Sequence, residues 1–333
     1  MRLLRNLFLL AVLVVMSASG AFWYWATQAV LPNEQAIDFV IKSGSSVRSA
    51  GRQIEESGVP VPAMLFEAMA RISGKASQLK AGSYELEPGK TPLDLLEKIV
   101  NGEFSQASIA IIEGWSFAQM RKLIDDHPAL RHDTRNLSES ELMKKLGADV
   151  RFGEGMFFPD TYLFAKGSSD LQFYQQAYAM QMKRIDDAWA ARAPDLPYKN
   201  KYEALIMASI IEKETGQSSE RAMIAAVFTN RLKQGMLLQT DPTVIYGMGD
   251  RYQGKIYKRD LLTDTPYNTY TRAGLPPTPI SLPGLASLTA ALNPAHSDAL
   301  YFVAKGDGTS QFSHNLDEHN RAVNKYQRSS NVK

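Results

Sequence analysis

The chain of 333 residues has no cysteine, so disulfide bonds and thiolate chemistry are excluded. This absence says little about the cellular compartment, although it suits an oxidising one, where free thiols are a liability. The chain also lacks a strong charge of either sign, because 37 basic and 35 acidic residues leave a net charge of +2. No stretch is dense in Lys and Arg, so the sequence does not indicate a nucleic-acid partner.

Motifs of several enzyme classes are missing as well. The sequence has no G-x-S-x-G, no P-loop and no G-x-G-x-x-G. Five histidines form neither HExxH nor another metal-binding spacing: His127, His132, His296, His314 and His319. We therefore expect no metal and no cofactor, and a nucleophilic side chain is poorly supported. Acidic residues among aromatic and polar ones remain, and this pattern suits a carbohydrate, which stacks its apolar faces on aromatic rings.

The sequence has one long hydrophobic run, Leu7 to Trp25, which contains nineteen residues and no charge. At about 1.5 Å per residue, this run covers roughly 28 Å, which is close to the hydrocarbon thickness of a bilayer. It ends in the aromatic cluster 22–25, and such clusters sit at the level of the lipid headgroups. The run is therefore predicted to cross a membrane.

Two arginines before this run, Arg2 and Arg5, set its orientation. By the positive-inside rule we expect a cytoplasmic N-terminus at 1–6 and a single membrane-spanning anchor at 7–27, with the rest of the chain on the other side. The alternative is a cleaved signal peptide, because the small residues of 17–21 offer a cleavage site. The aromatic cluster lies beyond that site, where a discarded segment would not need it, and this favours the anchor.

After a short linker at 31–34, the pattern predicts a small α+β module over 36–104. The expected elements follow the order strand, helix, helix, strand, helix, at 36–42, Ser45 or Ser46 to Gly58, 62–72, 79–86 and 91–100. Glycine and serine punctuate the strands, and Ser and Thr precede two of the helices as caps.

The remainder, 105–330, is predicted to form a mixed α/β catalytic domain, so that the fold class of the chain is α+β. Strands are expected at 107–112 and 299–304, and helices at 169–192, 201–215, from Ser218 or Ser219 to Lys233, and from Asp317. Segment 116–151 is expected to be helical with loops, and 153–162 to be a loop. Segment 236–281 is rich in Gly, Pro, Thr, Asn and Tyr, and we expect a functional loop region there.

Two glutamates end the apolar helix predicted at 201–215. On a helix of about 100° per residue, Glu214 lies within roughly 80° of the bulky residues 206, 207, 210 and 211, whereas Glu212 lies about 160° away. A carboxyl on the apolar face loses solvent, which raises its pKa, and a general acid that works near neutral pH needs such a shift. The alternative is that both glutamates are solvated at a frayed helix end.

Several segments carry a resemblance to a known family. The most specific are ASIIEKET at 208–215, LQTDPTVIYG at 238–247, YNTY at 267–270 and GLPP at 274–277, and KAGSY at 80–84, EG at 113–114 and FPDT at 158–161 fit as well. In their order and approximate spacing, these segments resemble the YceG-like endolytic murein transglycosylases (MltG) over essentially the whole chain. The stretch 126–152 matches no motif of that family.

This resemblance implies an enzyme that cleaves the glycan strands of peptidoglycan internally, between N-acetylmuramic acid and N-acetylglucosamine. Such a lyase leaves 1,6-anhydro-muramyl ends and limits the length of nascent strands beside the peptidoglycan synthases. It implies a single-pass protein of the inner membrane with a periplasmic catalytic domain. Segment 36–104 resembles a LysM-like glycan-binding subdomain, and the alternative is a structural spacer.

The resemblance also implies the site. Glu214 matches the catalytic glutamate of the family, which first protonates the glycosidic oxygen and then takes the proton of the attacking muramyl C6 hydroxyl. Candidates for holding the sugar are Gln239, Asp241, Tyr246, Tyr267 and Asn268. Each of these could instead brace the loop region, and Asp241 before Pro242 could form a turn.

Two rival functions remain open. The first is a muramidase-type hydrolase on the same substrate, with Glu214 as the acid and Asp241 as the base. The second is a membrane-tethered glycan-binding scaffold without catalysis, which would not need a carboxyl on a buried face. The sequence separates the transglycosylase from the hydrolase only weakly, because both need an acid.

Overall fold

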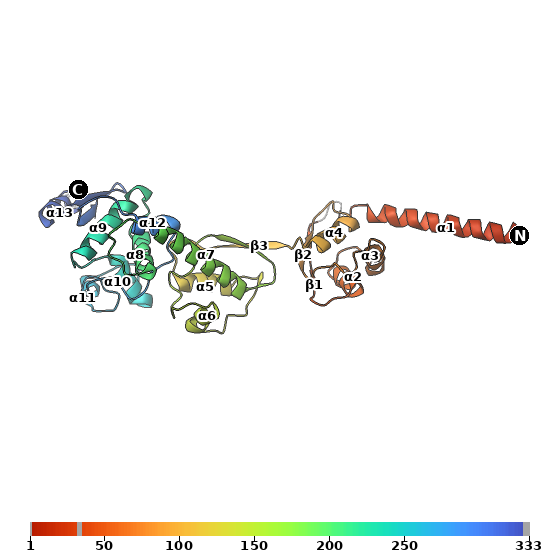
Figure 1. The fold of residues 1–333 in the computed structure, drawn as a ribbon, viewed down its shortest axis with the longest axis horizontal. Helices are drawn as coiled ribbons and strands as arrows, with labels where there is room; N and C mark the ends of the chain where they lie inside the picture. Colours follow the sequence, from red (N-terminus) through yellow and green to blue (C-terminus); the bar gives the residue numbers. More distant parts are fainter. Residues whose placement is uncertain (1, 32–34, 329–333) are drawn as a thin grey trace. The chain divides into compact units, whose positions relative to one another are not determined.

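The structure of the chain, a computed structural model, describes residues 2–31 and 35–328, so most of the linker predicted at 31–34 lies outside the described residues. The fold is α+β and begins with a long apolar helix, as predicted (Figure 1). The chain forms two compact units. The N-terminal unit is Met1–Ser108 with Ala129–Arg131 and Leu163–Ser168, and the C-terminal unit is the remainder.

Helix α1, Arg2–Ala26, is long and apolar enough to cross a membrane, and among the described residues it is the one helix that passes this test. Its apolar window is fully exposed, which is consistent with an anchor or a signal sequence. The chain just after α1 is fixed to the N-terminal unit, because the Val30 amide donates to the Lys90 carbonyl and the Gly89 amide donates to the Leu31 carbonyl, each at 2.8 Å.

The rest of the N-terminal unit follows the predicted order of elements, with β1 at Ile37–Ile41, α2 at Val47–Glu56, α3 at Ala63–Ile72, β2 at Gly82–Leu86 and α4 at Pro92–Asn101. The two strands pair antiparallel, with Ile37 opposite Leu86. Side-chain caps start the helices at Ser46 and Thr91, as their sequences indicate. Gly102 adopts the left-handed conformation that ends α4.

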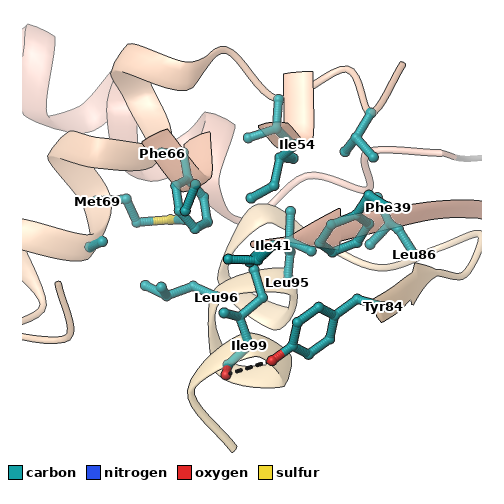
Figure 2. Packing of buried hydrophobic residues seen from close by; sticks show 14 of the residues in the cluster. Phe39, Ile41, Ile54, Phe66, Met69, Tyr84, Leu86, Leu95, Leu96 and Ile99 are labelled. Carbon is teal, nitrogen blue, oxygen red and sulfur yellow. Dashed lines mark hydrogen bonds between the residues drawn. The ribbon is translucent and has the colours of Figure 1, made fainter. Parts of the chain in front are cut away.

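The core of this unit is apolar and aromatic (Figure 2). Phe39 of β1 stacks on Tyr84 of β2, with ring centroids 5.5 Å apart. The Tyr84 hydroxyl would be costly to bury alone, and it donates to the carbonyl oxygens of Lys80 at 2.8 Å and Ile99 at 3.3 Å. Strands β1 and β2 and helices α2, α3 and α4 thus share one hydrophobic core.

The C-terminal unit is mainly helical. Its helices are α5 (Phe117–Asp125), α6 (Glu139–Lys145), α7 (Asp170–Ala190), α8 (Lys201–Glu214), α9 (Arg221–Lys233), α10 (Asp241–Met248), α11 (Lys258–Leu262), α12 (Leu285–Leu292) and α13 (Leu316–Val323), with short 3-10 helices η1 (Ser218–Glu220) and η2 (Gly249–Arg251) and a π-helical turn, η3 (Asn324–Arg328). Strand β7 (Tyr301–Ala304) pairs antiparallel with β8 (Ser310–Ser313). Among the described residues the chain has four further short strands: β3 (Gln106–Ala110) pairs with β5 (Thr161–Ala165), and β4 (Leu130–Arg131) pairs with β6 (Ser168–Ser169). Strand β4 belongs to the N-terminal unit, and β3, β5 and β6 each begin in one unit and end in the other.

Helix α8 is the centre of the C-terminal unit. Every residue from Ala204 to Ile211 is buried, and α7, α9, α10 and α12 pack around the helix (Figure 1). Because the helix is apolar on all sides, its sequence shows no strong amphipathic period. The burial of Leu205, Ala208 and Ser209 also means that the face opposite Glu214 is no less buried than its own.

The predicted loop region 236–281 is wrong in part, because α10 and α11 lie inside it. Helix α10 begins at Asp241 with Pro242 in its first turn, where a proline costs no hydrogen bond. Helix α12 and strand β8 were not expected either. Between these elements the segment is irregular, and it forms one wall of the site described next.

Candidate active site

A cleft of about 570 Å³ opens at the C-terminal end of α8 in the C-terminal unit. Glu214, the last residue of α8, lies in its wall and is half-buried. The other lining residues come from α9, α10, β7, α13 and the segments beside them, and they include Arg231, Leu238, Gln239, Asp241, Tyr270, Tyr301, Phe302 and His319. The cleft combines a carboxyl with aromatic and amide side chains, and a sugar-binding site needs this combination.

Burial raises the pKa of the Glu214 carboxyl above its ordinary value, and the nearby charge of Asp241 raises it further. A hydrogen bond from the Thr240 hydroxyl to Glu214 Oε1 acts in the opposite direction. The net direction is upward. Glu214 therefore keeps its proton to a higher pH than a solvated glutamate, which is what a general acid requires.

The segment before α10 brings Thr240 to Glu214 through a constrained backbone. Gln239 has a φ of +52°, in the left-handed region that a non-glycine residue rarely adopts. Two hydrogen bonds hold this conformation, from the Gln239 amide to the Thr269 carbonyl and from the Thr240 amide to Thr269 Oγ1, each at 3.1 Å. The strain is thus fixed at the residue that precedes the Glu214 contact.

Arg231 of α9 supports the same segment, although no sequence pattern indicated this role. Arg231 is 8% exposed, and its guanidinium donates to the carbonyl oxygens of Leu237 and Leu238 at 3.0 Å and of Leu300 at 2.7 Å. It also lies 5.0 Å from the Tyr301 ring centroid. Because its partners are backbone carbonyl oxygens, buried Arg231 positions the segment before α10. This role can be recognised only once the backbone fold is known.

Asp241 starts α10, where the helix dipole favours a negative charge. Its Oδ1 accepts a hydrogen bond from the Tyr270 hydroxyl at 2.6 Å. Burial and this bond to Asp241 raise the pKa of Tyr270, so the phenol keeps its proton. Asp241 is thus a carboxylate close to Glu214 with one oxygen held by a neutral donor.

The three consecutive residues Glu212, Lys213 and Glu214 at the end of α8 contact different parts of the C-terminal unit. The Glu212 side chain is 7% exposed, accepts a hydrogen bond from the Gly284 amide at 3.0 Å and lies 3.7 Å from Arg221. Lys213 Nζ donates to the Gly114 carbonyl at 3.1 Å. Glu212 and Lys213 therefore brace the start of α12 and the 113–114 segment, and Glu214 alone of the three lines the cleft.

Tyr246 and Tyr267, predicted to contact the sugar, pack against each other with ring centroids 4.9 Å apart. Tyr246 donates to Glu154 Oε2 at 3.1 Å, and the Tyr267 hydroxyl is 2.8 Å from Thr278 Oγ1. Within the part of the chain that the structure describes, these two tyrosines and Asn268 are not among the residues that line the Glu214 cleft. Their direct contact with substrate stays a prediction.

Asn268 is completely buried and braces the backbone. Its amide nitrogen lies near three carbonyl oxygens around α11, with donor distances of 3.4 Å to Asp260, 3.0 Å to Leu261 and 2.8 Å to Thr263. Its Oδ1 accepts from the Tyr270 amide at 2.8 Å. Asn268 thereby connects the α11 segment to the tyrosine that contacts Asp241.

Glu154 is a second buried carboxyl, and sequence reasoning did not select it. It is 5% exposed, and burial raises its pKa to about 7. The Phe117 amide donates to Oε1 at 3.0 Å, and Tyr246 donates to Oε2. The residue lies in the predicted loop 153–162, whose acidic and aromatic composition was visible but gave no indication of burial.

Among the described residues, one group of potential metal ligands occurs away from the cleft. Ligand atoms of Asp125, His132 and Asp170 lie within 4.8 Å of one another. Asp170 already accepts hydrogen bonds from the amides of Asp133 and Thr134 and from the Thr134 hydroxyl, at 2.7 to 3.1 Å. These bonds account for the burial of the Asp170 carboxylate as a cap of the 133–134 turn.

Comparison with known proteins places these features in a family. A model of the YceG-like family matches residues 39–325. A Bacillus subtilis protein named endolytic murein transglycosylase is 32% identical, over 94% of this chain and 92% of its own length. A Streptococcus pneumoniae protein of the same name is 28% identical over 94% of this chain, which spans 63% of that relative's length.

A solved structure is similar as well. The crystal structure of a yceG-like protein from Listeria monocytogenes matches with a TM-score of 0.56 and 31% sequence identity. The match covers 87% of this chain and 99% of that one. The likeness therefore extends over most of the chain.

Proposed function

Since the chain belongs to the YceG-like family, whose relatives named above are endolytic murein transglycosylases, we propose that it is a lytic transglycosylase of peptidoglycan. It cuts glycan strands internally, between N-acetylmuramic acid and N-acetylglucosamine, and leaves 1,6-anhydro-muramyl ends. The observation that carries this proposal is Glu214, a carboxyl with a raised pKa in the wall of an aromatic cleft. Gln239 and Asp241 line this cleft, whereas Tyr246, Tyr267 and Asn268 do not, and all five stay candidates for holding the sugar in this proposal.

The reaction needs one acid that later acts as a base. Protonated Glu214 donates its proton to the glycosidic oxygen as the bond from that oxygen to muramyl C1 breaks. The resulting carboxylate accepts the proton of the muramyl C6 hydroxyl, whose oxygen forms the new bond to C1. Glu214 ends protonated, and no water is consumed, so the second carboxylate of an ordinary glycosidase is not needed to activate one.

Asp241 and Tyr270 complete the electrostatics in this proposal. A carboxylate close to Glu214 stabilises the positive charge that develops on the sugar ring and also holds the Glu214 proton in place. The Tyr270 hydroxyl fixes one oxygen of Asp241 at 2.6 Å. In the rival hydrolase, Asp241 would have to activate a water molecule, and its hydrogen bond with Tyr270 leaves one oxygen for that task.

In the same proposal, the N-terminal unit holds the enzyme at the inner membrane. Helix α1 anchors the protein in the inner membrane with its N-terminus in the cytoplasm, and the C-terminal unit and the part of the N-terminal unit that follows α1 lie in the periplasm. The short connection between α1 and the module at Val30 and Lys90 then keeps that module close to the bilayer. As a LysM-like subdomain it binds glycan there, beside the synthases that release nascent strands.

Product analysis tests the proposal. Purified full-length protein in detergent is incubated with isolated peptidoglycan, and the new ends are identified by mass spectrometry and a reducing-end assay. We expect 1,6-anhydro ends, lighter by one water than hydrolysed ends, and early shortening of long strands. Predominant reducing muramyl ends would establish the hydrolase, and binding to peptidoglycan without any new ends would establish the scaffold.

A further inference from the structure

A second cavity of about 540 Å³ lies in the C-terminal unit, around the end of α10 that is far from Glu214. Its lining comes from α10, η2, α11 and the segments between them: Val244, Met248, Arg251, Gln253, Lys255, Tyr257, Arg259, Asp260, Thr263 and Thr265. Its volume is typical of small-ligand sites. The catalytic proposal makes no use of this cavity, which we name the basic pocket.

The charge of the basic pocket is mostly positive. Arg251, Lys255 and Arg259 are exposed around it, and the one carboxylate in the lining belongs to Asp260. That carboxylate is engaged, because Asp260 Oδ2 accepts from the Tyr257 amide at 2.8 Å and Oδ1 lies 3.8 Å from Arg259. The pocket therefore has a surplus of cations and fits a ligand that carries carboxylates.

Besides these charges, the basic pocket has an aromatic ring and an apolar wall. Lys255 Nζ lies 5.5 Å and the Arg259 guanidinium 5.2 Å from the centroid of the Tyr257 ring, which holds both cations at the rim. Val244 and Met248 of α10 contribute aliphatic surface. The combination suits a short peptide with small aliphatic side chains and a free carboxylate rather than a bare inorganic anion.

The basic pocket is tied to the Glu214 cleft by two rigid connections. Helix α10 has Asp241 in the cleft at its first residue and Met248 in the basic pocket at its last, a rise of about 10 Å. Asn268 bonds both to the backbone of the α11 segment and to the Tyr270 amide. A ligand that occupies both sites is thus held in a fixed register.

We propose that the basic pocket binds the carboxylates of the stem peptides that muramic acid carries on its lactyl group. The inference rests on the proposed function, because it assigns the pocket to another part of the same polymer. A strand with its glycosidic bond at Glu214 projects peptides from nearby muramic acids, and the fixed distance along α10 lets one of them reach the cations. Arginine binds carboxylates in a bidentate manner that a point charge cannot match.

The test compares two substrates and a triple variant. Wild-type protein and Arg251→Gln/Lys255→Gln/Arg259→Gln are assayed for anhydro ends on peptide-bearing glycan strands and on strands stripped of peptides by an amidase. We expect the variant to lose at least ~10-fold in kcat/KM on peptide-bearing strands, since charge-assisted hydrogen bonds are lost, mainly through KM. On stripped strands the two proteins should be equally active.

A matched control carries the same change of charge elsewhere on the C-terminal unit. The variant Lys144→Gln/Lys145→Gln/Lys199→Gln replaces three exposed lysines that do not line the basic pocket, and it should behave as wild type on both substrates. Thermal unfolding of all three proteins establishes that the variants fold. An equal loss on both substrates, or no loss on peptide-bearing strands, would overturn the inference.

A binding measurement separates this inference from the catalytic proposal. A soluble stem peptide with a free C-terminal carboxylate is titrated into wild-type protein by calorimetry, beside the C-terminally amidated peptide and inorganic phosphate. We expect the free peptide to bind wild type and not the triple variant, and the amidated form to bind more weakly. Equal binding of phosphate, or of the amidated peptide, contradicts peptide recognition, whether or not the protein forms anhydro ends.

Discussion

Two carboxyl groups of the N-terminal unit and two of the C-terminal unit lie in opposite environments. In the N-terminal unit, Glu67 and Asp94 have lowered pKa values, Glu67 because of its hydrogen bonds with Arg71 and Arg48, and Asp94 because of its bonds with Thr91. In the C-terminal unit, burial raises the pKa values of Glu154 and Glu214. The first pair stabilises helices as anions, whereas the second pair resists ionisation inside the unit.

The direction of the pKa shift distinguishes carboxyl groups that stabilise the fold at neutral pH from those that destabilise it when they ionise. A carboxylate that is better stabilised in the fold than in the unfolded chain favours the folded state at neutral pH. A buried carboxyl with a raised pKa disfavours the folded state once it ionises, so its retention needs another reason. For Glu214 the reason is the proposed proton transfer, and for Glu154 it is the connection between the 153–155 segment and α10.

The largest expected effect comes from the acid in the cleft. Glu214→Gln keeps the size of the side chain and its contact with Thr240 but removes the transferable proton. We expect the rate of anhydro-end formation to fall by at least ~100-fold, the usual scale of general acid catalysis. The rate is measured on isolated peptidoglycan, and circular dichroism checks the fold.

Glu212→Gln is the matched control, because it changes the same helix two residues away. Its amide oxygen can still accept from the Gly284 amide, so the brace to α12 survives and the loss of activity should be much smaller. An inactive Glu212→Gln beside an active Glu214→Gln would show that the acid has been assigned to the wrong residue.

The next effect concerns Glu154 and appears in stability. Its folded pKa of about 7 lies above the ordinary 4.5, so the fold is favoured fully below pH 4.5 and loses this contribution as pH rises through 7. The loss amounts to about 3 kcal/mol above pH 8, at 1.36 kcal/mol per pKa unit. Urea unfolding of wild-type protein at a series of pH values should show this decline.

Glu154→Gln should flatten that profile, because the amide has no charge to bury and retains an acceptor for the Phe117 amide. Asp186→Asn provides the comparison, since Asp186 is an exposed carboxylate paired with Lys201 and its replacement should leave the decline between pH 5 and pH 8 in place. If Glu154→Gln and wild type decline in parallel, the pH dependence arises at another group.

The contrast also explains what the sequence could predict. Local signals governed the N-terminal unit: the Ser46 and Thr91 caps and the left-handed Gly102 lie within a few residues of the helix ends that they define. In the C-terminal unit, α12 is a short apolar run, and periodicity cannot distinguish a buried helix from a strand over eight residues. The sequence alone therefore could not predict that α12 is a helix.

The residues of the candidate site also differ in how well the sequence predicts them. Glu214 was accessible from the sequence through its motif and through the apolar run before it, although the all-round burial of α8 shows that a helical face alone does not single it out. Arg231 and Glu154 gain their roles from carbonyls and hydroxyls far along the chain. Such partners depend on tertiary structure, which spacing in the sequence does not encode.

The smallest expected effect tests the folding side of the comparison, at the start of α4. Asp94 accepts from the Thr91 amide and hydroxyl at 2.9 Å each, so Asp94→Ala should cost about 1 kcal/mol, measured by hydrogen exchange of the α4 amides in the full chain. Glu97→Ala changes another residue of α4 and removes its ion pair with Lys75, which lies after α3, and it should cost less. Because the folded pKa of Asp94 is lowered from 3.8, its stabilising effect is present above that pH and disappears as pH falls through the folded value. The difference between wild type and Asp94→Ala should therefore shrink below pH 4, whereas a difference that persists there would mean that the capping bonds do not depend on the charge.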